Sequence, residues 1–485
     1  MTRIYGHFIH NASPQPSSWI ERISPAHGTV VAKFAEGQDS DVDAAVRAAR
    51  AAFDTGPWPH MDAERRASVL ERVAALVADN LERLARIEVE EVGKPIRFAR
   101  HDMQTVVALF KYAAGLAMQL HGLAYSTIGA KRTGIVLREP VGVVGLIIPW
   151  NFPAETLAKK LPFALAAGCT CVVKPSELTS GTALELASLA AQADMPPGVI
   201  NVVTGYGDVV GSALSGHPGV DMLSFTGSTR VGRHVIARAG EHIARSAVEL
   251  GGKGATIVFR DADVEAAVDG ALASVFFNQG ECCVAGSRLL VQRDIADRFV
   301  EKLVGKANAL RVGDPFAETT DLGAMIHRQQ LDRVLGHVDA ARREGAKQLC
   351  GEVMLSCESL FMKPVIFDHV QPSMGIFSEE IFGPVLSVTR FDSPQEALAL
   401  ANQTDYALAN SVWTSDLDTA LEFTKRLRSG IVWINTALDG ALQLPFGGNR
   451  SSGFGRELGE AGIEEFTTLK SVLIHTGKRQ PLFAP

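Results

Sequence analysis

Apolar residues recur at helical spacing through the N-terminal third of the chain. The stretch 40–53 opens with Ser40, a residue type that can cap a helix, and the stretch 62–95 repeats apolar positions at intervals of three and four. Gly93 and Pro95 end that repeat. The pattern predicts a helical N-terminal third.

The period of the pattern changes from Val141 onward. Short β-branched runs at 141–149, 169–175, 199–205 and 222–227 alternate with helical segments, and a second series follows at 254–259, 287–292, 409–414 and 430–435. Such alternation predicts parallel strands joined by crossover helices. We therefore expect an α/β fold with two doubly wound domains, the first built from residues 1–121 and 141–251 and the second from residues 252–448.

Two strand-like segments, 122–140 and 466–485, lie outside both series. A strand needs a neighbouring edge, and a second subunit can supply one. We expect these segments to form a small β oligomerisation ribbon in a homodimer or homotetramer.

Composition narrows the class of protein. A chain of 485 residues exceeds the length at which one core stops growing. The net charge is −7 without a run of five like charges, so we expect no nucleic-acid partner. The longest apolar run, 141–150, is about half as long as a membrane span, and the N-terminal stretch "MTRIYGHFIHNASPQP" lacks a long apolar core. We expect neither a membrane nor export.

The six cysteines are too sparse for a disulfide framework, and they lack the paired CxxC spacing of a zinc site. We therefore expect no metal and a cytoplasmic location.

Polar residues follow the strands of the first series. Trp150 and Asn151 come directly after the first run, where open α/β sheets bind ligands. The Asn151 amide can donate to a developing oxyanion, although a polar residue between prolines also suits a plain turn. Lys174 can hold a hydroxyl or phosphate, and Glu177 can accept from a ribose diol. The alternative is a plain helix start, with Ser176 as the cap and Glu177 in the first turn.

Glycine-rich turns end several of the other runs. Gly205, Gly207, Gly211, Gly227 and Ser228 could let the backbone approach a pyrophosphate. Because no GxGxxG motif follows the first strand, a nucleotide site here would have a variant geometry.

Two glutamates also stand next to glycines. Glu249 precedes Gly251 and Gly252, which leave room for a water, so it can act as a general base. The alternative is that Glu249 is only a solvated turn residue. Glu380 can bind a diol beside Phe382, an aromatic side chain that can pack on a ring.

These motifs stand in a distinctive order. They are PWNFP (149–153), KPSE (174–177), FTGS (225–228), ELGGK (249–253), NQGECC (278–283), EEIFGP (379–384), PFGG (445–448) and GRE (455–457). In order and spacing they resemble the NAD(P)-dependent aldehyde dehydrogenase superfamily, from about residue 24 to about residue 476. The resemblance implies a Rossmann-like NAD-binding first domain and a catalytic second domain.

Adjacent cysteines, Cys282 and Cys283, follow Gly280 and Glu281. In the family's Gly-Gln-x-Cys pattern the nucleophile is the fourth residue, which is Cys283, so Cys282 takes the variable position and is expected to pack. Glu281 replaces the usual glutamine and keeps the spacing.

The resemblance implies a reaction through Cys283. The thiolate attacks the aldehyde, and the Asn151 side chain and the Cys283 backbone N–H stabilise the oxyanion. After hydride transfer, Glu249 activates the water that hydrolyses the thioester. Lys160 and Glu457 match positions that relay the proton outward.

The family's cofactor positions fall on Trp150, Lys174, Glu177, Gly207, Gly211, Ser228, Glu380 and Phe382. A carboxylate at Glu177 accepts from the free ribose hydroxyls of NAD but repels the 2′-phosphate of NADP, so NAD is expected and NADP is disfavoured. Lys174 softens this preference.

The family's substrate positions fall on Phe152, Thr156, Lys159, Phe277, Asp439, Gly440 and Phe446. Lys159 stands where members that handle quaternary ammonium aldehydes carry an aromatic ring, so betaine aldehyde is disfavoured. Lys159 would attract a carboxylate-bearing semialdehyde, whereas Asp439 and Glu155 would attract an amine. The sequence leaves both open and supports only an aliphatic or polar aldehyde.

Two other functions are compatible with this fold. A coenzyme A-acylating semialdehyde dehydrogenase would use the same cysteine but typically lacks the base found here as Glu249. A non-catalytic structural protein with this fold would be expected to lose Cys283, Asn151 or Glu249, and all three are present.

Overall fold

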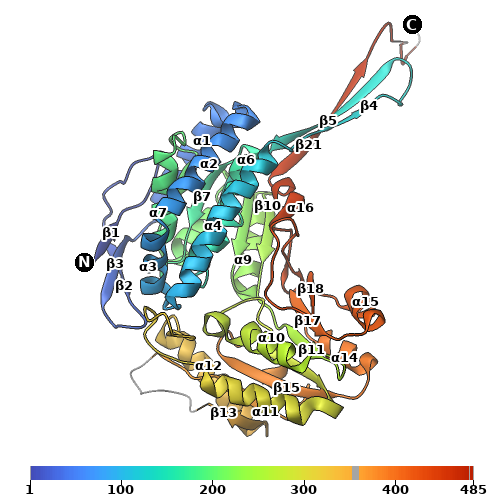
Figure 1. Cartoon of the computed structure of the whole chain (residues 1–485). Coiled ribbons are helices and arrows are strands. Elements are labelled where there is room, and N and C mark those ends of the chain that lie inside the picture. Colours follow the sequence, from blue (N-terminus) through green and yellow to red (C-terminus); the bar gives the residue numbers. More distant parts are fainter. Residues whose placement is uncertain (1, 352–359, 480, 484–485) are drawn as a thin grey trace.

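The computed structural model describes residues 2–351, 360–479 and 481–483, and two large sheets organise it (Figure 1). The first sheet has the order β20-β10-β9-β6-β7-β8, with β6 (Val143–Ile147), β7 (Thr170–Lys174), β8 (Ile200–Val202), β9 (Met222–Thr226), β10 (Arg245–Glu249) and β20 (Gly453–Phe454). The second has the order β13-β14-β15-β12-β11-β17-β18, with β11 (Ala255–Val258), β12 (Arg288–Gln292), β13 (Lys347–Cys350), β14 (Val365–Asp368), β15 (Val385–Phe391), β17 (Ala409–Trp413) and β18 (Ile431–Ile434). All pairs except those of the edge strands β20 and β13 are parallel, so the predicted pair of doubly wound α/β units is confirmed.

Helices cover the first sheet on both faces. They are α1 (Asp39–Asp54), α2 (Ala63–Asp79), α3 (Leu81–Val92), α4 (Ile96–Ala117), α5 (Pro153–Ala158), α6 (Leu161–Ala167), α7 (Gly181–Gln192), α8 (Ser212–Ser215) and α9 (Thr229–Gly240), with the short turns η1 (Trp58–His60) and η2 (Gly207–Gly211). Strands β6 and β7 are buried along their whole length. Full burial explains why these strands read as continuous apolar runs.

The N-terminal region differs from its prediction in three ways. Residues before α1 form a small sheet of β1 (Arg3–Tyr5), β2 (Trp19–Ile23) and β3 (Val30–Ala35) instead of helix. Ser40 does not cap α1, because the helix already begins at Asp39 and the Asp41 carboxylate accepts from the N–H of Gln38 at 2.8 Å. The periodic stretch 62–95 is two helices, which separate at Asn80. The Asn80 side chain donates to the carbonyl of Leu76 at 2.8 Å and competes with the helical bonds there.

The second sheet is also covered on both faces. Its helices are α10 (Val264–Phe276), α11 (Arg293–Ala309), α12 (Arg328–Arg343), α13 (Gly375–Ser378), α14 (Pro394–Ala401) and α15 (Leu417–Arg426), with the turn η3 (Phe277–Gly280). One core joins α10 and α11 to the sheet, and a separate core joins α12, α14 and α15 to it.

The two segments outside the α/β series pair with each other. β5 (Arg132–Pro140) lies between β21 (Thr467–His475) and β4 (Leu123–Tyr125), and this ribbon projects away from the body (Figure 1). Leu137, Leu469 and Leu473 are exposed on it. The remaining elements are α16 (Gly459–Glu464) at its base and the pair β16 (Tyr406–Ala407) and β19 (Asn449–Arg450).

Candidate active site

The carboxyl ends of four strands, β6, β7, β9 and β10, gather the predicted polar residues at one edge of the first sheet. β6 lies between β7 and β9, and Ile147 is opposite both Lys174 and Phe225. β10 continues the parallel series, so that Glu249 is opposite Thr226. Parallel strands end at the same edge, which is where open α/β sheets bind ligands.

A tight left-handed turn delivers the two cysteines to this edge. Asn278 and Gln279 have φ of 50° and 58°, and Gly280 has φ of 75°. A Cβ at Gly280 would overlap a neighbouring backbone carbonyl, so only glycine fits this position. Beyond the turn, Cys282 is buried with 7% of its surface exposed, whereas Cys283 is partly exposed.

Hydrogen bonds lock Asn151 against the cysteine loop. Its amide nitrogen donates to the carbonyl of Glu281 at 2.9 Å. The amide of Asn278 donates to the same carbonyl at 3.1 Å and to the carbonyl of Asn151 at 3.2 Å. An amide nitrogen has two hydrogens, so one N–H of Asn151 is left for a ligand.

The unusual Glu281 is fully buried beside this lock. One carboxyl oxygen accepts from the N–H of Ile326 at 3.1 Å. Burial raises the pKa of Glu281 well above its usual range, which favours the neutral acid. Glu281 takes the glutamine position of the family pattern.

The thiols of Cys282 and Cys283 influence each other. A hydrogen bond with the Cys282 thiol and burial raise the pKa of Cys283, and the Lys159 ammonium acts in the opposite direction. Neighbouring thiols titrate as a pair, so a thiolate on one raises the pKa of the other. Of the two cysteines, Cys283 is the more exposed.

Glu249 lies in a small buried cavity rather than in solvent. The cavity has a volume of about 10 Å³, enough for about one water, and its lining includes Lys160, Arg456 and Glu457. Burial and the Glu457 carboxylate raise the pKa of Glu249 well above its usual range. The N–H of Gly448 donates to one carboxyl oxygen at 3.2 Å. Glu249 is 5% exposed, so it is not a solvated turn residue.

Lys160 connects this cavity to the sheet. Its buried ammonium donates to the Ser224 hydroxyl at 2.9 Å and forms an ion pair with Glu457. Lys160, Glu249 and Glu457 thus form one buried group of titratable side chains.

A second set of predicted residues includes the neighbours of the turn that joins β10 to β11. The rings of Trp150 and Phe382 pack edge to face with centroids 5.3 Å apart. Glu380 accepts from the N–H of Gly252 at 3.0 Å, and a Cβ at Gly251 would overlap its carboxyl group. The Gly-Gly turn therefore fits closely around the Glu380 carboxyl group.

The other predicted ligand-binding residues lie at the ends of β7, β8 and β9. Lys174 donates to Glu177 at 3.1 Å. Ser176 does not cap a helix, because α7 begins only at Gly181. Apart from its chain neighbours and the backbone of its own helical turn, no described atom lies within 4 Å of a Cβ placed on Gly211. The Ser228 hydroxyl caps α9.

Aromatic side chains cluster around Phe277, in the turn that precedes the cysteines. Phe152 and Phe277 stack with centroids 5.8 Å apart, and Phe98 packs edge to face on Phe277 at 4.8 Å. The Lys159 ammonium lies 4.7 Å from the centre of the Phe446 ring and pairs with Glu155 at 2.7 Å. Lys159 and Glu155 therefore neutralise each other at this position.

The remaining predicted substrate residues lie apart or are covered. Asp439 and Gly440 are exposed, and the Asp439 carboxylate accepts from the hydroxyl of Thr436 in its own loop. Thr156 is buried. The sequence motifs do not single out two further residues beside this aromatic cluster, Phe98 and Lys94. The Lys94 ammonium lies 4.3 Å from the centre of the Phe152 ring. In the sequence, Gly93–Pro95 indicates only the end of a helical repeat.

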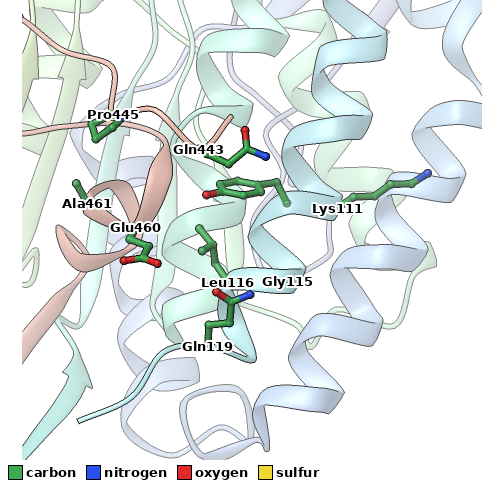
Figure 2. Close-up of a pocket in the computed structure, with 9 residues that line it drawn as sticks. Lys111, Gly115, Leu116, Gln119, Gln443, Pro445, Glu460 and Ala461 are labelled. Carbon is green, nitrogen blue, oxygen red and sulfur yellow. The ribbon is translucent and has the colours of Figure 1, made fainter. Parts of the chain in front are cut away.

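A separate open cavity of about 570 Å³ lies between α4 and α16 (Figure 2). Its lining residues are Lys111, Tyr112, Gly115, Leu116, Gln119, Gln443, Pro445, Glu460 and Ala461. None of the predicted site residues is among them, so this cavity is distinct from the site described above.

No helix in residues 2–351, 360–479 and 481–483 is long and apolar enough to cross a membrane. In the same ranges, no group of three or more His, Cys, Asp or Glu side chains is arranged to hold a metal ion.

The chain matches known proteins over nearly its whole length. It is 41% identical over 473 residues to aldehyde dehydrogenase family 2 member C4 of Arabidopsis thaliana, covering 97% of this chain and 94% of that protein. It is 43% identical over 455 residues to the mitochondrial aldehyde dehydrogenase of Homo sapiens, covering 93% of this chain and 88% of that protein.

Solved structures match as closely. The NAD-dependent aldehyde dehydrogenase of Sinorhizobium meliloti superposes with a TM-score of 0.99 at 46% identity, covering 100% of this chain and 97% of that one. The betaine aldehyde dehydrogenase of Staphylococcus aureus in complex with NAD+ has a TM-score of 0.97 at 35% identity, covering 99% and 97%. The model of the aldehyde dehydrogenase family matches residues 11–472, and the chain therefore belongs to that family.

Proposed function

We propose that the protein oxidises an aldehyde to the carboxylic acid with NAD, through a thiohemiacetal and a thioester on Cys283. One observation carries this proposal. The Asn151 side-chain amide donates to the carbonyl of Glu281, and the partly exposed thiol of Cys283 lies two residues further along the same loop. The test is a panel of aldehydes offered with NAD or NADP and followed at the absorbance of the reduced nicotinamide.

The residues present fit a dinucleotide. Lys174 and Glu177 offer a cation and a carboxylate for one ribose, and Glu380 offers a carboxylate for the other. The open space at Gly211 and the N-terminus of α9 suit a pyrophosphate. Trp150, Phe382, Gly207 and Ser228 complete the set that would hold NAD. When bound, NAD supplies the acceptor for the aldehyde hydride.

Asn151 and Cys283 would carry out the first step. The Cys283 thiolate adds to the carbonyl carbon, and the carbonyl oxygen becomes an oxyanion. The free N–H of the Asn151 amide and the backbone N–H of Cys283 donate to that oxyanion. The Lys159 ammonium favours the thiolate, because a nearby positive charge lowers the pKa of a thiol.

Glu249 would carry out the last step. It takes a proton from water, the water oxygen bonds to the thioester carbon, and the Cys283 thiolate leaves. Lys160 and Glu457 share the cavity of Glu249, so they can receive the proton. A coenzyme A-acylating enzyme would not need this buried base, and a structural protein would need none of these groups.

The proposed domain division follows the two sheets except at β20 (Gly453–Phe454), which joins the first sheet from the C-terminal part of the chain. We propose an NAD-binding domain of residues 1–121 and 141–251 and a catalytic domain of residues 252–448, with 122–140 and 466–485 as oligomerisation segments. We also propose a cytoplasmic location, from the cysteine content alone. The neutralised Lys159 and Glu155 pair favours neither a carboxylate nor an amine strongly, so the substrate is proposed as an aliphatic or polar aldehyde.

Glu177 is expected to set the choice of cofactor. In Glu177→Gln the carboxylate that repels a 2′-phosphate is gone, so the ratio of kcat/KM for NAD over NADP should fall at least about tenfold. Glu185→Gln, on α7 and outside the site, is the control. An unchanged ratio in Glu177→Gln would assign cofactor choice to other residues.

The ribbon is expected to hold subunits together. Leu469 and Leu473 are each 65% exposed, and β4 and β21 leave free edges on either side of β5. Light scattering should give two or four times the chain mass of 51.9 kDa. Truncation after Thr467 should shift the measured mass to that of one chain. Leu473→Glu, which changes a residue near Ile135, should do the same, whereas Lys478→Glu should not. A wild-type monomer, or a truncated chain that stays assembled, would contradict this role.

A further inference from the structure

Three successive residues before the cysteines have a left-handed backbone. Gly280 suits this conformation, but Asn278 and Gln279 carry side chains, so their backbone is strained. A strained backbone persists only where the surrounding structure holds it in place. The turn therefore needs support from other parts of the chain.

The backbone of residues 323–326, just before α12, supplies part of that support. The N–H of Gly323 donates to the side-chain oxygen of Gln279 at 3.3 Å, and the side-chain nitrogen of Gln279 donates to the carbonyl of Ala324 at 3.4 Å. Gln279 is 1% exposed, so water does not compete for these two bonds. Both ends of the Gln279 amide are thus bound by one backbone segment.

The same segment binds a second side chain of the cysteine loop. Glu281 is 0% exposed, and one of its carboxyl oxygens accepts from the N–H of Ile326 at 3.1 Å. A buried backbone N–H needs an acceptor, so this bond stabilises both partners. The segment therefore holds the loop at two positions, and we call it the 323–326 clamp.

The 323–326 clamp is itself fixed to the N-terminal part of the chain. The N–H of Ala324 donates to the carbonyl of Gly93 at 3.1 Å, and a Cβ at Gly323 would overlap that carbonyl group. The buried Arg22 guanidinium donates to the carbonyl of Ile326 at 3.2 Å. These contacts tie the clamp to β2 and to the end of α3, so it is a fixed support for the loop.

Support at the Glu281 side chain reaches the reacting groups through the backbone of the same residue. The Glu281 carbonyl accepts from the Asn151 amide at 2.9 Å, and Cys283 lies two residues further along the loop. The remaining Asn151 N–H and the Cys283 N–H are the proposed donors to the oxyanion. A misplacement of about 1 Å can lower a rate about a hundredfold, so the position of this loop matters for forming the thioester.

We infer that Gln279 and Glu281 are positioning residues that connect the cysteine loop to the 323–326 clamp. Through them, the clamp places the Asn151 amide and the Cys283 thiol for attack on the aldehyde. Both side chains act through the backbone of the loop and not on the aldehyde itself. The inference rests on the reaction proposed at Cys283.

Labelling with iodoacetamide tests the clamp without turnover. In the wild type, Cys283 should be labelled faster than the buried Cys282, and mass spectrometry of the digested full-length protein gives both rates. Gln279→Met and Glu281→Met each remove bonds to the clamp, so the loop should loosen and the ratio of the two rates should fall about tenfold. Cys171, buried within β7, should keep its wild-type rate of labelling, because the rest of the fold stays closed.

Two variants control this comparison. Glu281→Gln keeps an oxygen that can accept from the Ile326 N–H, so its labelling ratio should stay within about twofold of that of the wild type. Asp221→Met removes a carboxyl group that accepts from the N–H of Val143 at 2.7 Å. Val143 begins β6, at the opposite end of that strand from the site, so Asp221→Met should leave the ratio unchanged.

Kinetics separate positioning from folding. In Glu281→Met, kcat/KM for the aldehyde, which covers the steps up to the thioester, should fall about tenfold to a hundredfold. The Kd for NAD, measured by calorimetry, should stay within about twofold of the wild-type value, because the cofactor residues keep their places. Glu281→Gln should recover most of the lost kcat/KM.

An unchanged labelling ratio in both Gln279→Met and Glu281→Met would overturn the inference. Equal acceleration of labelling at Cys282 and Cys171 would also overturn it, because that pattern means that the whole fold opens. If Glu281→Met gives no folded protein, the ratio in Gln279→Met decides the question. Wild-type protein that oxidises no aldehyde would overturn the proposed function, and the labelling ratios would still test the clamp.

Discussion

Replacing Cys283 by alanine is expected to lower kcat for aldehyde oxidation by about 10⁴-fold or more, because no other group in the proposed mechanism can form the thioester. Cys282→Ala should keep most of the activity, since Cys282 is buried behind the reactive position. Both variants are assayed with the best aldehyde of the panel and NAD. Circular dichroism and NAD affinity confirm that they are folded.

The adjacent position of the two cysteines makes this comparison sharp. Cys282→Ala also removes the hydrogen bond that raises the pKa of Cys283, so its rate should reach a plateau at lower pH than that of the wild type. Equal losses in the two folded variants would mean that Cys283 is not the nucleophile.

Glu249→Gln is expected to separate the two halves of the reaction. Formation of the thioester does not need the hydrolytic water, so the variant should release one equivalent of reduced nicotinamide per active site in a burst. Steady-state turnover should then fall about 10²–10⁴-fold, the usual contribution of a positioned base. Stopped-flow absorbance measures both phases. Glu465→Gln is the control, because Glu465 is another carboxyl residue that lines the same cavity.

The pH profile of the wild type should carry the signature of this base. The pKa of Glu249 is raised, and a base acts only when deprotonated, so deacylation should rise with pH above the range of an ordinary carboxyl group. Glu249→Gln should lack that rise. Full steady-state turnover without a burst in the variant would remove Glu249 from the reaction.

The alternation of short apolar runs and helical segments was sufficient to predict the two sheets. It worked because strands such as β6 and β7 are buried on both faces and therefore read as continuous apolar runs. The N-terminal sheet was missed. Its strands β1 and β2 are only partly buried and pair only with β3, so their sequences carry little local signal.

At the site, strand ends could be located from the sequence, but the direction of side chains could not. The sequence alone does not decide whether Asp439 or Lys159 faces the substrate. In the structure, the Asp439 carboxylate accepts from the Thr436 hydroxyl, and Lys159 pairs with Glu155. The left-handed turn at Asn278 and Gln279 was also unforeseen, because neither residue is a glycine.

The most direct test of the central claim is mass spectrometry of the acyl-enzyme. Glu249→Gln is mixed with NAD and an aldehyde, quenched in acid, and digested, and the peptide containing both cysteines is fragmented between them. The proposed mechanism predicts an acyl group of the mass of the substrate on Cys283 and none on Cys282. An acyl group on Cys282, or a burst of reduced nicotinamide without any acylated cysteine, would contradict it.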